Sequence, residues 1–252
     1  MFPIGDENEP GHGPAIVSLA LIALNVIVFL VLQGAGSSSG DEFTYGYAAV
    51  PFEITHGTDL VEPTPITVDG QTGQIPQEPG PSPIWLTLLT SMFMHGGWLH
   101  IGGNMLFLWV FGDNVEHRMG RIRYLLFYLA AGVIGSLAQI AISPDSTIPT
   151  LGASGAISGV LGAYIVLFPG NRVTVFLFRI VTKVPALVAI GLWAALQFVN
   201  GIGAFAVTEE TGGGVAYMAH IGGFVAGVVV GLVLRALGGG GRRRGGDRSA
   251  FG

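Results

Sequence analysis

The chain has 252 residues, of which 50% are hydrophobic and 11% carry a charged side chain. Soluble domains contain about 25% charged residues, so this composition, with a mean hydropathy of +0.61, excludes an ordinary soluble protein and indicates an integral membrane protein. The formal net charge of −5 hides a separation of the two signs along the chain, and the absence of cysteine excludes disulfides, thiol catalysis and cysteine-ligated zinc.

Residues 1–14 form an acidic segment without lysine or arginine. This segment matches neither the basic start of a signal peptide nor an arginine-rich transit peptide, so we expect the first apolar run to be retained as a span. A span needs about 20 apolar residues. Six runs are candidates, at 15–32, 99–112, 124–142, 151–168, 185–205 and 215–234. The sequence therefore predicts an all-α polytopic membrane protein with six transmembrane helices.

Basic residues indicate how these spans are oriented. Lysine and arginine occur only in three clusters, at 118–123, 172–183 and 235–248, which share one side if there are six spans. Because short basic loops face the cytoplasm, we expect both termini, including the short segment 1–14, to be cytoplasmic. The connections 34–98, 143–150 and 206–214 then face outward. We expect 15–237 to form one membrane domain and 238–252 to be a flexible basic cytoplasmic tail.

The long outward connection 34–98 is rich in proline, glycine, threonine and aspartate, which argues against a buried core of its own. Its end, 83–95, is too short to span a bilayer, yet its large apolar residues follow helical spacing. These residues are Trp85, Leu86, Leu89, Met92 and Phe93. We therefore expect a helix lying in the outer membrane interface, with an irregular apolar loop as the alternative.

Strongly polar side chains inside spans are costly and are therefore candidates for function. His100 and Asn104 lie one helical turn apart in the second predicted span. Ser154 lies near the outer end of the fourth span, and His220 near the outer end of the sixth. Both of these spans carry regularly spaced glycines, which let membrane helices pack closely. The serine and the histidine could then meet as a nucleophile and its general base.

Each of these residues also has a simpler explanation. Ser154 could act only in helix packing, which is the role we expect for Ser158, one turn deeper. His100 and His220 could form a proton relay or, with His95, a metal site, but the spans lack an H-E-x-x-H motif and nearby acids. His95 is expected in a loop, where it either supports the site or is exposed. Three further histidines are assigned to loops without a role: His12, His56 and His117.

The motifs GASGAISG at 152–159, HIGGNMLFLWVFGDNVEHRMG at 100–120 and AHIGGFVAG at 219–227 resemble, in residues and order, the rhomboid family of intramembrane serine proteases. The similarity covers about 83–234 and, more loosely, the first span. It implies that Ser154 is the nucleophile and that His220 is the general base of a dyad without an aspartate. It also implies that His100, Asn104 and the backbone N–H of Ser154 form the oxyanion hole.

Two details accompany this resemblance. Glu116 and Arg118 match an acidic–basic turn after the second span of the family, which we interpret as a structural anchor. Some members carry an aromatic residue four positions after the serine, stacked on the catalytic histidine, and here that position is Ser158. We therefore expect other groups, Tyr217 or the glycine face, to orient His220.

The resemblance implies an intramembrane serine endopeptidase that cleaves single-span membrane proteins in or near the outer end of their transmembrane segment. Its predicted partners are these substrates and the lipid bilayer, without nucleic acid, metal or cofactor, and the oligomeric state is left open. The predicted location is a prokaryotic plasma membrane. Asn200, Gly201 and Gly203 weaken the outer end of the fifth span, which is a candidate lateral gate, with 206–214 as a cap.

Two alternatives belong to other functional classes. A non-proteolytic rhomboid-like protein would bind single-span clients without cleaving them, and the intact Ser154 and His220 disfavour it. A small transporter or proton channel would use His100 and His220 as a relay. The absence of internal repeats and of acids within the membrane disfavours that reading.

Overall fold

Helices occupy the positions of all six predicted spans. The computed structural model describes residues 2–7, 13–68, 71–177, 179–206 and 216–238. The first predicted span is α1 (Ile16–Ile27), which continues as the π-helical η1 (Val28–Leu32). The others are α5 (Trp98–Met119), α6 (Arg121–Ile142), α7 (Ser154–Leu167), α8 (Ala186–Ala206) and α9 (Tyr217–Gly238). The predominantly helical fold is therefore confirmed, and α5 runs on past its predicted end at 112.

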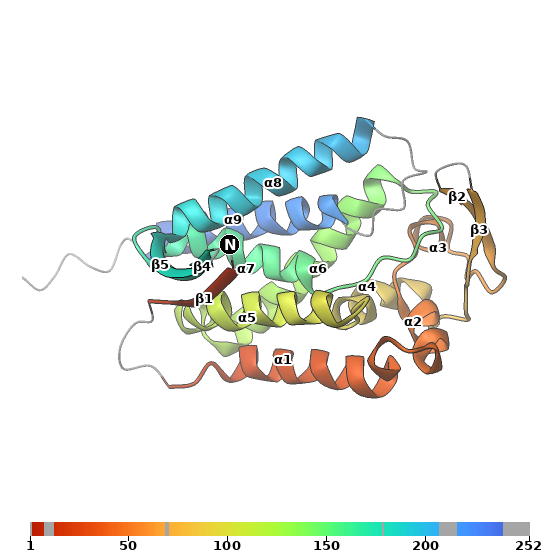
Figure 1. The fold of residues 1–252 in the computed structure, drawn as a ribbon, viewed down its shortest axis with the longest axis horizontal. Coiled ribbons are helices and arrows are strands. Elements are labelled where there is room, and N and C mark those ends of the chain that lie inside the picture. The colour runs from red at the N-terminus through yellow and green to blue at the C-terminus, as the bar shows by residue number, and fades with distance from the viewer. Residues whose placement is uncertain (1, 8–12, 69–70, 178, 207–215, 239–252) are drawn as a thin grey trace, which may run out of the picture.

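Helix α7 lies in the middle of the bundle, with α5, α6 and α9 packed around it (Figure 1). Every residue from Gly155 to Tyr164 is buried. A helix that is apolar on all faces is typical of such a central position. Its glycines and alanines let neighbouring backbones come close. Ser154, at its first turn, is thereby placed inside the ring of helices.

Within the described residues, two helices are long and apolar enough to cross a membrane. These are α6 and α9, whose stretches Arg121–Ile142 and Tyr217–Leu237 each reach a mean hydropathy of 2.0. Shorter apolar helical stretches occur at Ile16–Leu32, Ile84–Phe93, Ser154–Leu167 and Ala186–Gly201. That all six helices cross the bilayer stays a prediction.

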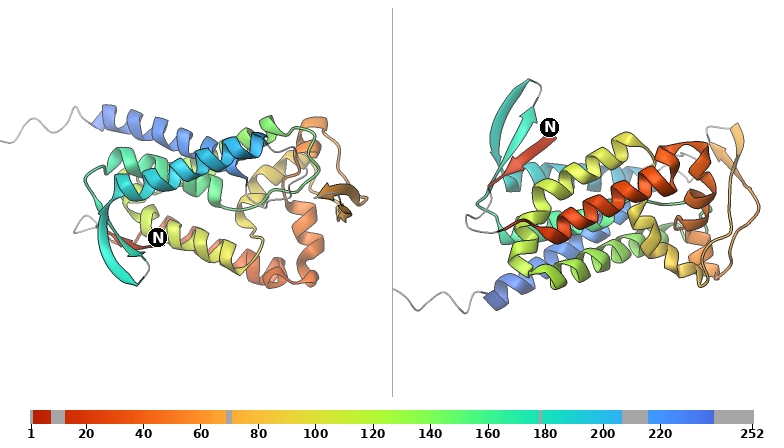
Figure 2. Two further views of the ribbon diagram at one scale, coloured as in Figure 1. Left: turned by 45° about the horizontal axis from the view of Figure 1, so that its top comes forward. Right: turned by 90° about the horizontal axis from the view of Figure 1, so that it is seen from below.

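Two small antiparallel sheets lie at opposite ends of the bundle, and neither was predicted (Figures 1 and 2). One contains β1 (Phe2–Asp6), β4 (Arg172–Leu177) and β5 (Ile180–Pro185) in the order β1-β4-β5. The other is the hairpin of β2 (Thr64–Val68) and β3 (Gln71–Ile75). An all-α description was therefore incomplete. The β-branched stretches RVTVFL and IVTKVP were the available signal, since such residues favour strands.

The N-terminal strand ties together the C-terminal ends of α5 and α7. The Asp6 carboxylate accepts hydrogen bonds from the Tyr164 hydroxyl of α7 at 2.6 Å and from Nδ2 of Asn114 of α5 at 2.7 Å. The Glu116 carboxylate of α5 accepts hydrogen bonds from the backbone N–H groups of Val17 and Ser18, at 3.0 and 2.8 Å. Because these N–H groups lie in the first turn of α1, a carboxylate there is favourable. The interpretation of Glu116 as a structural anchor is confirmed.

The connection between α1 and α5 folds into short elements over the other end of the bundle. Its helical turns are η2 (Gly34–Gly36), η3 (Ser38–Gly40), α2 (Asp41–Tyr47), α3 (Pro51–His56), η4 (Ile84–Leu86), α4 (Thr87–Thr90) and η5 (Ser91–Phe93). Ala48 and Met94 are buried with Val28 of η1, so the connection shares a core with the bundle. The single interfacial helix expected over 83–95 is thus replaced by three consecutive turns.

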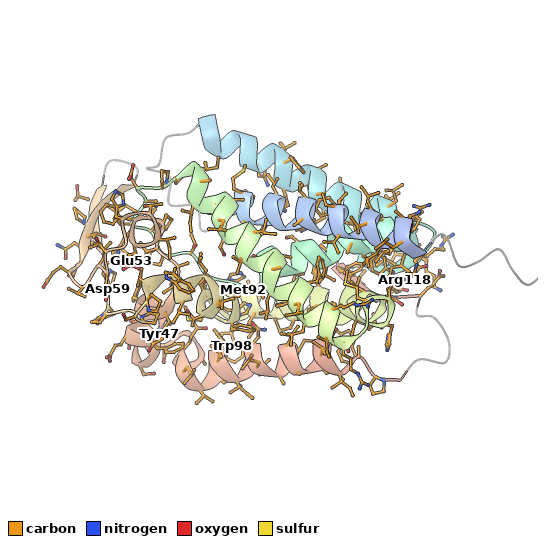
Figure 3. The ribbon with its side chains drawn as sticks, turned by 180° about the vertical axis from the view of Figure 1, so that it is seen from behind. Tyr47, Glu53, Asp59, Met92, Trp98 and Arg118 are labelled. Atoms are coloured by element: carbon orange, nitrogen blue, oxygen red, sulfur yellow. The ribbon has the colours of Figure 1, made fainter. Side chains whose placement is uncertain are left out.

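The single apolar face that the spacing predicted is not found, because its residues divide between the surface and the core. Trp85 is 57% exposed, whereas Met92 is 2% exposed and points into the helix bundle (Figure 3). The same view shows Arg118 at one end of the molecule and Glu53 and Asp59 at the other. Arg118 and these two acidic residues therefore lie at opposite ends of the bundle (Figure 3), while Asp6 and Glu116 are acidic residues at the Arg118 end.

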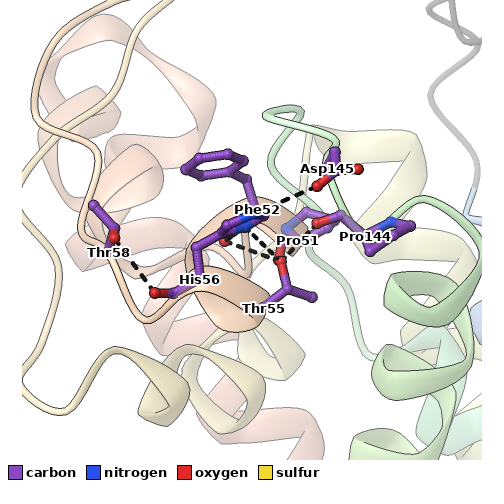
Figure 4. Close-up of polar contacts among 7 residues, drawn as sticks. All are labelled: Pro51, Phe52, Thr55, His56, Thr58, Pro144 and Asp145. Atoms are coloured by element: carbon purple, nitrogen blue, oxygen red, sulfur yellow. Dashed lines mark hydrogen bonds and ion pairs between the residues drawn. The ribbon is translucent and has the colours of Figure 1, made fainter.

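Helix α3 is attached to the connection that follows α6 (Figure 4). The Thr55 hydroxyl donates a hydrogen bond to the carbonyl oxygen of Pro144 at 2.8 Å. Nε2 of His56 lies 3.6 Å from a carboxylate oxygen of Asp145. The assignment of His56 and His117 to loops was wrong, because His56 ends α3 and His117 lies in α5. His12, the predicted cap from 207 onward and the tail from 239 lie outside the described residues.

Candidate active site

Ser154 is the first residue of α7, directly after a turn that requires glycine. Gly152 has φ of +131°, a conformation that side-chain-bearing residues rarely adopt. Its N–H donates a hydrogen bond to the carbonyl oxygen of Ser91 at 2.9 Å, which fixes the entry to the helix. The backbone N–H groups of a first helical turn have no partner within the helix. Ser154 therefore sits where N–H groups and the helix dipole both favour negative charge.

Ser154 and His220 lie within hydrogen-bond distance of each other. Oγ of Ser154 is 2.8 Å from Nε2 of His220, in the first turn of α9. The two helices meet at their glycines, as the sequence predicted. A Cβ on Gly223 would collide with the carbonyl oxygen of Gly155, and a Cβ on Gly227 with that of Gly159. Since only glycine permits this approach, the glycines bring the two side chains together.

His100 faces the same place from α5. Its Nδ1 accepts a hydrogen bond from the N–H of Gly96 at 3.2 Å, which leaves the ring proton on Nε2. A Cβ on Gly152 would lie 2.9 Å from this Nε2 and 3.6 Å from Oγ of Ser154. Because Gly152 has no side chain, there is room for one atom between the Nε2 donor of His100 and Oγ of Ser154.

Asn104 lies one turn further along α5 and is 8% exposed. Its Nδ2 is buried and makes no hydrogen bond within the part of the chain that the structure describes. A buried amide donor without a partner is costly. It is therefore available to a group that enters the site.

Gln197 of α8 was not among the predicted site residues. Its Oε1 accepts a hydrogen bond from Nδ1 of His220 at 2.7 Å. Trp193, one turn earlier on α8, places its ring centroid 6.0 Å from that of His220. The signal that could have found Gln197 is a strongly polar amide in an apolar span, the same signal that singled out Asn104.

The other predicted residues surround this group. The Tyr217 ring lies 6.5 Å from the His220 ring and nearly perpendicular to it, so it contacts the histidine by an edge. The Ser158 hydroxyl donates a hydrogen bond to the carbonyl oxygen of Ser154 at 2.6 Å, within α7. The expectation that Tyr217 or the glycine face orients His220 thus omitted the group that hydrogen-bonds to the ring.

His95 is buried against the His100 ring, with centroids 5.1 Å apart. Its backbone is held by Gln33, whose side chain accepts a hydrogen bond from the His95 N–H at 2.8 Å and donates one to its carbonyl oxygen at 3.2 Å. Burial, and secondarily the neighbouring His100, lowers the pKa of His95 to about 3. Its ring is therefore neutral near pH 7 and part of the wall behind His100.

Comparison with known proteins gives consistent matches. A family model described as the rhomboid domain matches residues 83–237. The chain is 32% identical over 216 residues to Rhomboid protease GluP of Bacillus subtilis, covering 86% of this chain and 34% of the relative. It is 33% identical over 154 residues to Rhomboid protein 1, mitochondrial, of Saccharomyces cerevisiae, covering 58% of this chain and 41% of the relative.

A third relative is RHOMBOID-like protein 4 of Arabidopsis thaliana. It is 30% identical over 216 residues, which cover 84% of this chain and 51% of the relative. The chain therefore spans between a third and a half of the length of these three relatives.

Proposed function

The chain belongs to the rhomboid family, and from this premise we propose that it is an intramembrane serine endopeptidase with Ser154 as nucleophile and His220 as general base. The observation that carries the proposal is the 2.8 Å contact between Oγ of Ser154 and Nε2 of His220. A nucleophile within hydrogen-bond reach of a base, with the base held by a third group, is the general signature of covalent catalysis.

In the proposed reaction, Oγ of Ser154 attacks the scissile carbonyl carbon while Nε2 of His220 takes the hydroxyl proton. The carbonyl oxygen becomes negatively charged and sits in the space left by Gly152, near Nε2 of His100, with the Ser154 N–H proposed as a second donor. Asn104 completes the set of donors. Each oxyanion donor typically contributes about 3 kcal/mol to the transition state.

His220 then gives its proton to the leaving amine, and water hydrolyses the acyl-enzyme by the same steps. Hydrolysis within a bilayer requires water and shelter for charge, and hydrocarbon provides neither. Ser154, His220 and His100 all lie in the first turn of their helices, at the end of the bundle that bears the outer connection. A site there can open to water from one side.

The proposed substrates are single-span membrane proteins cleaved in or near the outer end of their transmembrane segment. A helix shields its own carbonyl groups by hydrogen bonding, so residues that weaken a helix, such as glycine and proline, expose the scissile bond. The proposed location is a prokaryotic plasma membrane, and the three basic clusters support the proposal that both termini are cytoplasmic and that the site lies toward the outside. Rhomboid proteins are integral membrane proteins, and the lipid bilayer is the proposed environment.

The test is cleavage of a single-span reporter by the purified full chain in liposomes. The reporter carries a Gly-Pro step near the outer end of its span, and a matched reporter carries Leu-Leu there. We expect the wild type to cleave the first reporter, and Ser154→Ala and His220→Ala to lose at least about 10³-fold in rate. A Ser154→Ala variant that still cleaves would refute the proposal. If the wild type never cleaves the reporter but binds it as well as the Ser154→Ala and His220→Ala variants do, the client-binding alternative would be favoured.

A further inference from the structure

Nδ1 of His220 forms a hydrogen bond with Gln197 that bears on how Nε2 acts as a base. We infer that Gln197 is a positioning residue, whose amide oxygen keeps His220 in the tautomer with hydrogen on Nδ1 and thereby makes α8 the helix that orients the base. This inference rests on the proposed function and deepens it, since it says what prepares Nε2 to accept the proton of Ser154.

The hydrogen-bond geometry selects one tautomer. A neutral imidazole has one N–H and one acceptor nitrogen. Oε1 of Gln197 lies 2.7 Å from Nδ1, and a carbonyl-type oxygen can only accept, so the proton belongs on Nδ1. Nε2, 2.8 Å from Oγ of Ser154, then presents its lone pair to the hydroxyl. The opposite tautomer would set two lone pairs against each other at Gln197 and would leave Nε2 unable to act as a base.

Among the described residues, the side chain that hydrogen-bonds Nδ1 of His220 belongs to α8. The sequences of α7, α8 and α9 contain no aspartate or glutamate that could orient the ring. The position four residues after Ser154 is Ser158, whose hydroxyl is engaged with the Ser154 carbonyl oxygen. Trp193 of α8 lies against the ring, one turn from Gln197. The hydrogen bond to Nδ1 and this aromatic contact therefore both come from α8.

Helix α8 is attached unevenly. Its first half buries Ala186, Ala189, Ile190 and Ala194. In its second half the inward contacts are those of Gln197 and Gly201 with α9, whereas Leu196 is 52% and Val199 66% exposed. Movement of this outer half would break the hydrogen bond between Gln197 and His220 without disturbing the glycine contacts of α7 and α9. The position of α8 would then control whether the base is in its active tautomer.

The first test reads the tautomer directly. Protein labelled with ¹⁵N-histidine is studied by NMR at about pH 8, with His220→Asn to identify the signals of His220. We expect the wild type to carry hydrogen on Nδ1. In Gln197→Leu, similar in size but without an acceptor, we expect a shift toward hydrogen on Nε2. Gln197→Glu keeps an acceptor oxygen and is expected to keep the proton on Nδ1. A wild type with hydrogen on Nε2 would overturn the inference.

The second test follows the rate at which a fluorophosphonate modifies Ser154. We expect Gln197→Leu to slow this reaction at least about tenfold, since general-base assistance is typically worth 10²–10⁴-fold. Gln197→Glu should restore most of the rate. Leu196→Ala removes a neighbouring side chain that is 52% exposed, and it should leave the rate unchanged.

Thermal unfolding of each variant separates positioning from folding. A Gln197→Leu protein that unfolds like the wild type, with unchanged tautomer and unchanged labelling, would overturn the inference while leaving the Ser154–His220 proposal intact. A wild type that is not labelled at Ser154 would instead refute the proposed function. The NMR result would then still decide whether Gln197 sets the tautomer.

Discussion

The glycine-packed pair α7 and α9 differs sharply from α8, although both contribute to one site. The pair holds Ser154 and His220 together through contacts between backbones, at Gly155 with Gly223 and at Gly159 with Gly227. Helix α8 contributes Gln197 from its inward face, while its opposite face, with Leu196 and Val199, is exposed. The comparison indicates that the reacting groups stand on a rigid support, whereas the group that orients the base stands on a helix with fewer restraints.

This difference has a physical cause in side-chain size. Where glycines meet, two backbones share a contact that no side-chain rearrangement can relax, so the distance between the helices is fixed. Where α8 presents leucine, valine and phenylalanine to its surroundings, side chains and helix can shift at low cost. In the proposed protease, this arrangement would let substrate enter beside α8 without moving Ser154.

A large side chain between α7 and α9 is expected to have the largest effect, because it separates these two helices. Gly227→Leu would place atoms on the carbonyl oxygen of Gly159, so α7 and α9 must separate. Overpacking of this kind costs on the order of 3 kcal/mol or more when backbone must move. We expect little folded protein and no labelling of Ser154, measured by gel filtration and fluorophosphonate reaction. Gly191→Leu on α8, where a Cβ meets nothing within 4 Å, should fold and react normally.

A smaller change tests the oxyanion space without separating the helices. Gly152→Ala would put a methyl group 2.9 Å from Nε2 of His100, in the space assigned to the oxyanion, at a backbone angle unfavourable to alanine. We expect a loss of about 10²–10³-fold in cleavage rate, similar to the removal of an oxyanion donor. Gly102→Ala, where a Cβ meets nothing within 4 Å, is the matched control. Equal rates for the two variants would contradict the assignment of this space.

The adjustable role of α8 can be tested with a disulfide, because the chain contains no cysteine. A Cβ on Gly201 would lie 3.5 Å from Cβ of Tyr217 at the start of α9, a separation that a disulfide accommodates. In Gly201→Cys/Tyr217→Cys we expect oxidation to lower cleavage of the single-span reporter at least about tenfold and reductant to restore it. Labelling of Ser154 by the small probe should change far less. If the oxidised and reduced proteins cleave the reporter at the same rate, α8 is not the gate.

The smallest expected effect lies in the connection between α1 and α5, which contains Glu53. Burial raises the pKa of Glu53 to about 7, and its Oε1 accepts a hydrogen bond from the Leu60 N–H at 2.8 Å. The folded state therefore keeps the Glu53 proton to higher pH than the unfolded chain does. Its contribution is fully present below about pH 4.5 and is lost as pH rises through about 7.

We expect the thermal midpoint of the wild type to fall by a few degrees between about pH 5 and about pH 8. Glu53→Gln keeps an acceptor oxygen for Leu60 but cannot ionise, so its midpoint should fall less. Hydrogen exchange at the Leu60 amide offers a local readout of the same change. Identical pH dependence in the two proteins would show that Glu53 does not titrate in this range.

The parts of the structure that the sequence predicted are marked by apolar runs, regularly spaced glycines or polar residues within apolar runs. Apolar runs located the helices, and regularly spaced glycines predicted the contact between α7 and α9. Polar residues in those runs marked Ser154, His220, His100 and Asn104 before any contact was known. These signals are visible locally, because lipid penalises polar side chains wherever they occur.

The parts that could not be predicted depend on contacts between distant segments. Strand β1 exists because Phe2–Asp6 pairs with β4, about 170 residues later, and the isolated segment has no strong strand pattern. The role of Gln197 follows from its hydrogen bond to His220, which links two different helices. Over 83–95 the spacing favoured one continuous helix, whereas the segment forms three consecutive turns with Met92 buried in the bundle.

The most direct test of the account is to react the wild type, Ser154→Ala and His220→Ala with a fluorophosphonate in liposomes and to map the adduct by mass spectrometry. We predict one adduct, on Ser154 of the wild type, absent from Ser154→Ala and at least about 10²-fold slower in His220→Ala. An unmodified Ser154 in folded wild-type protein, or equal labelling without His220, would contradict the claim that α7 and α9 together create an activated serine.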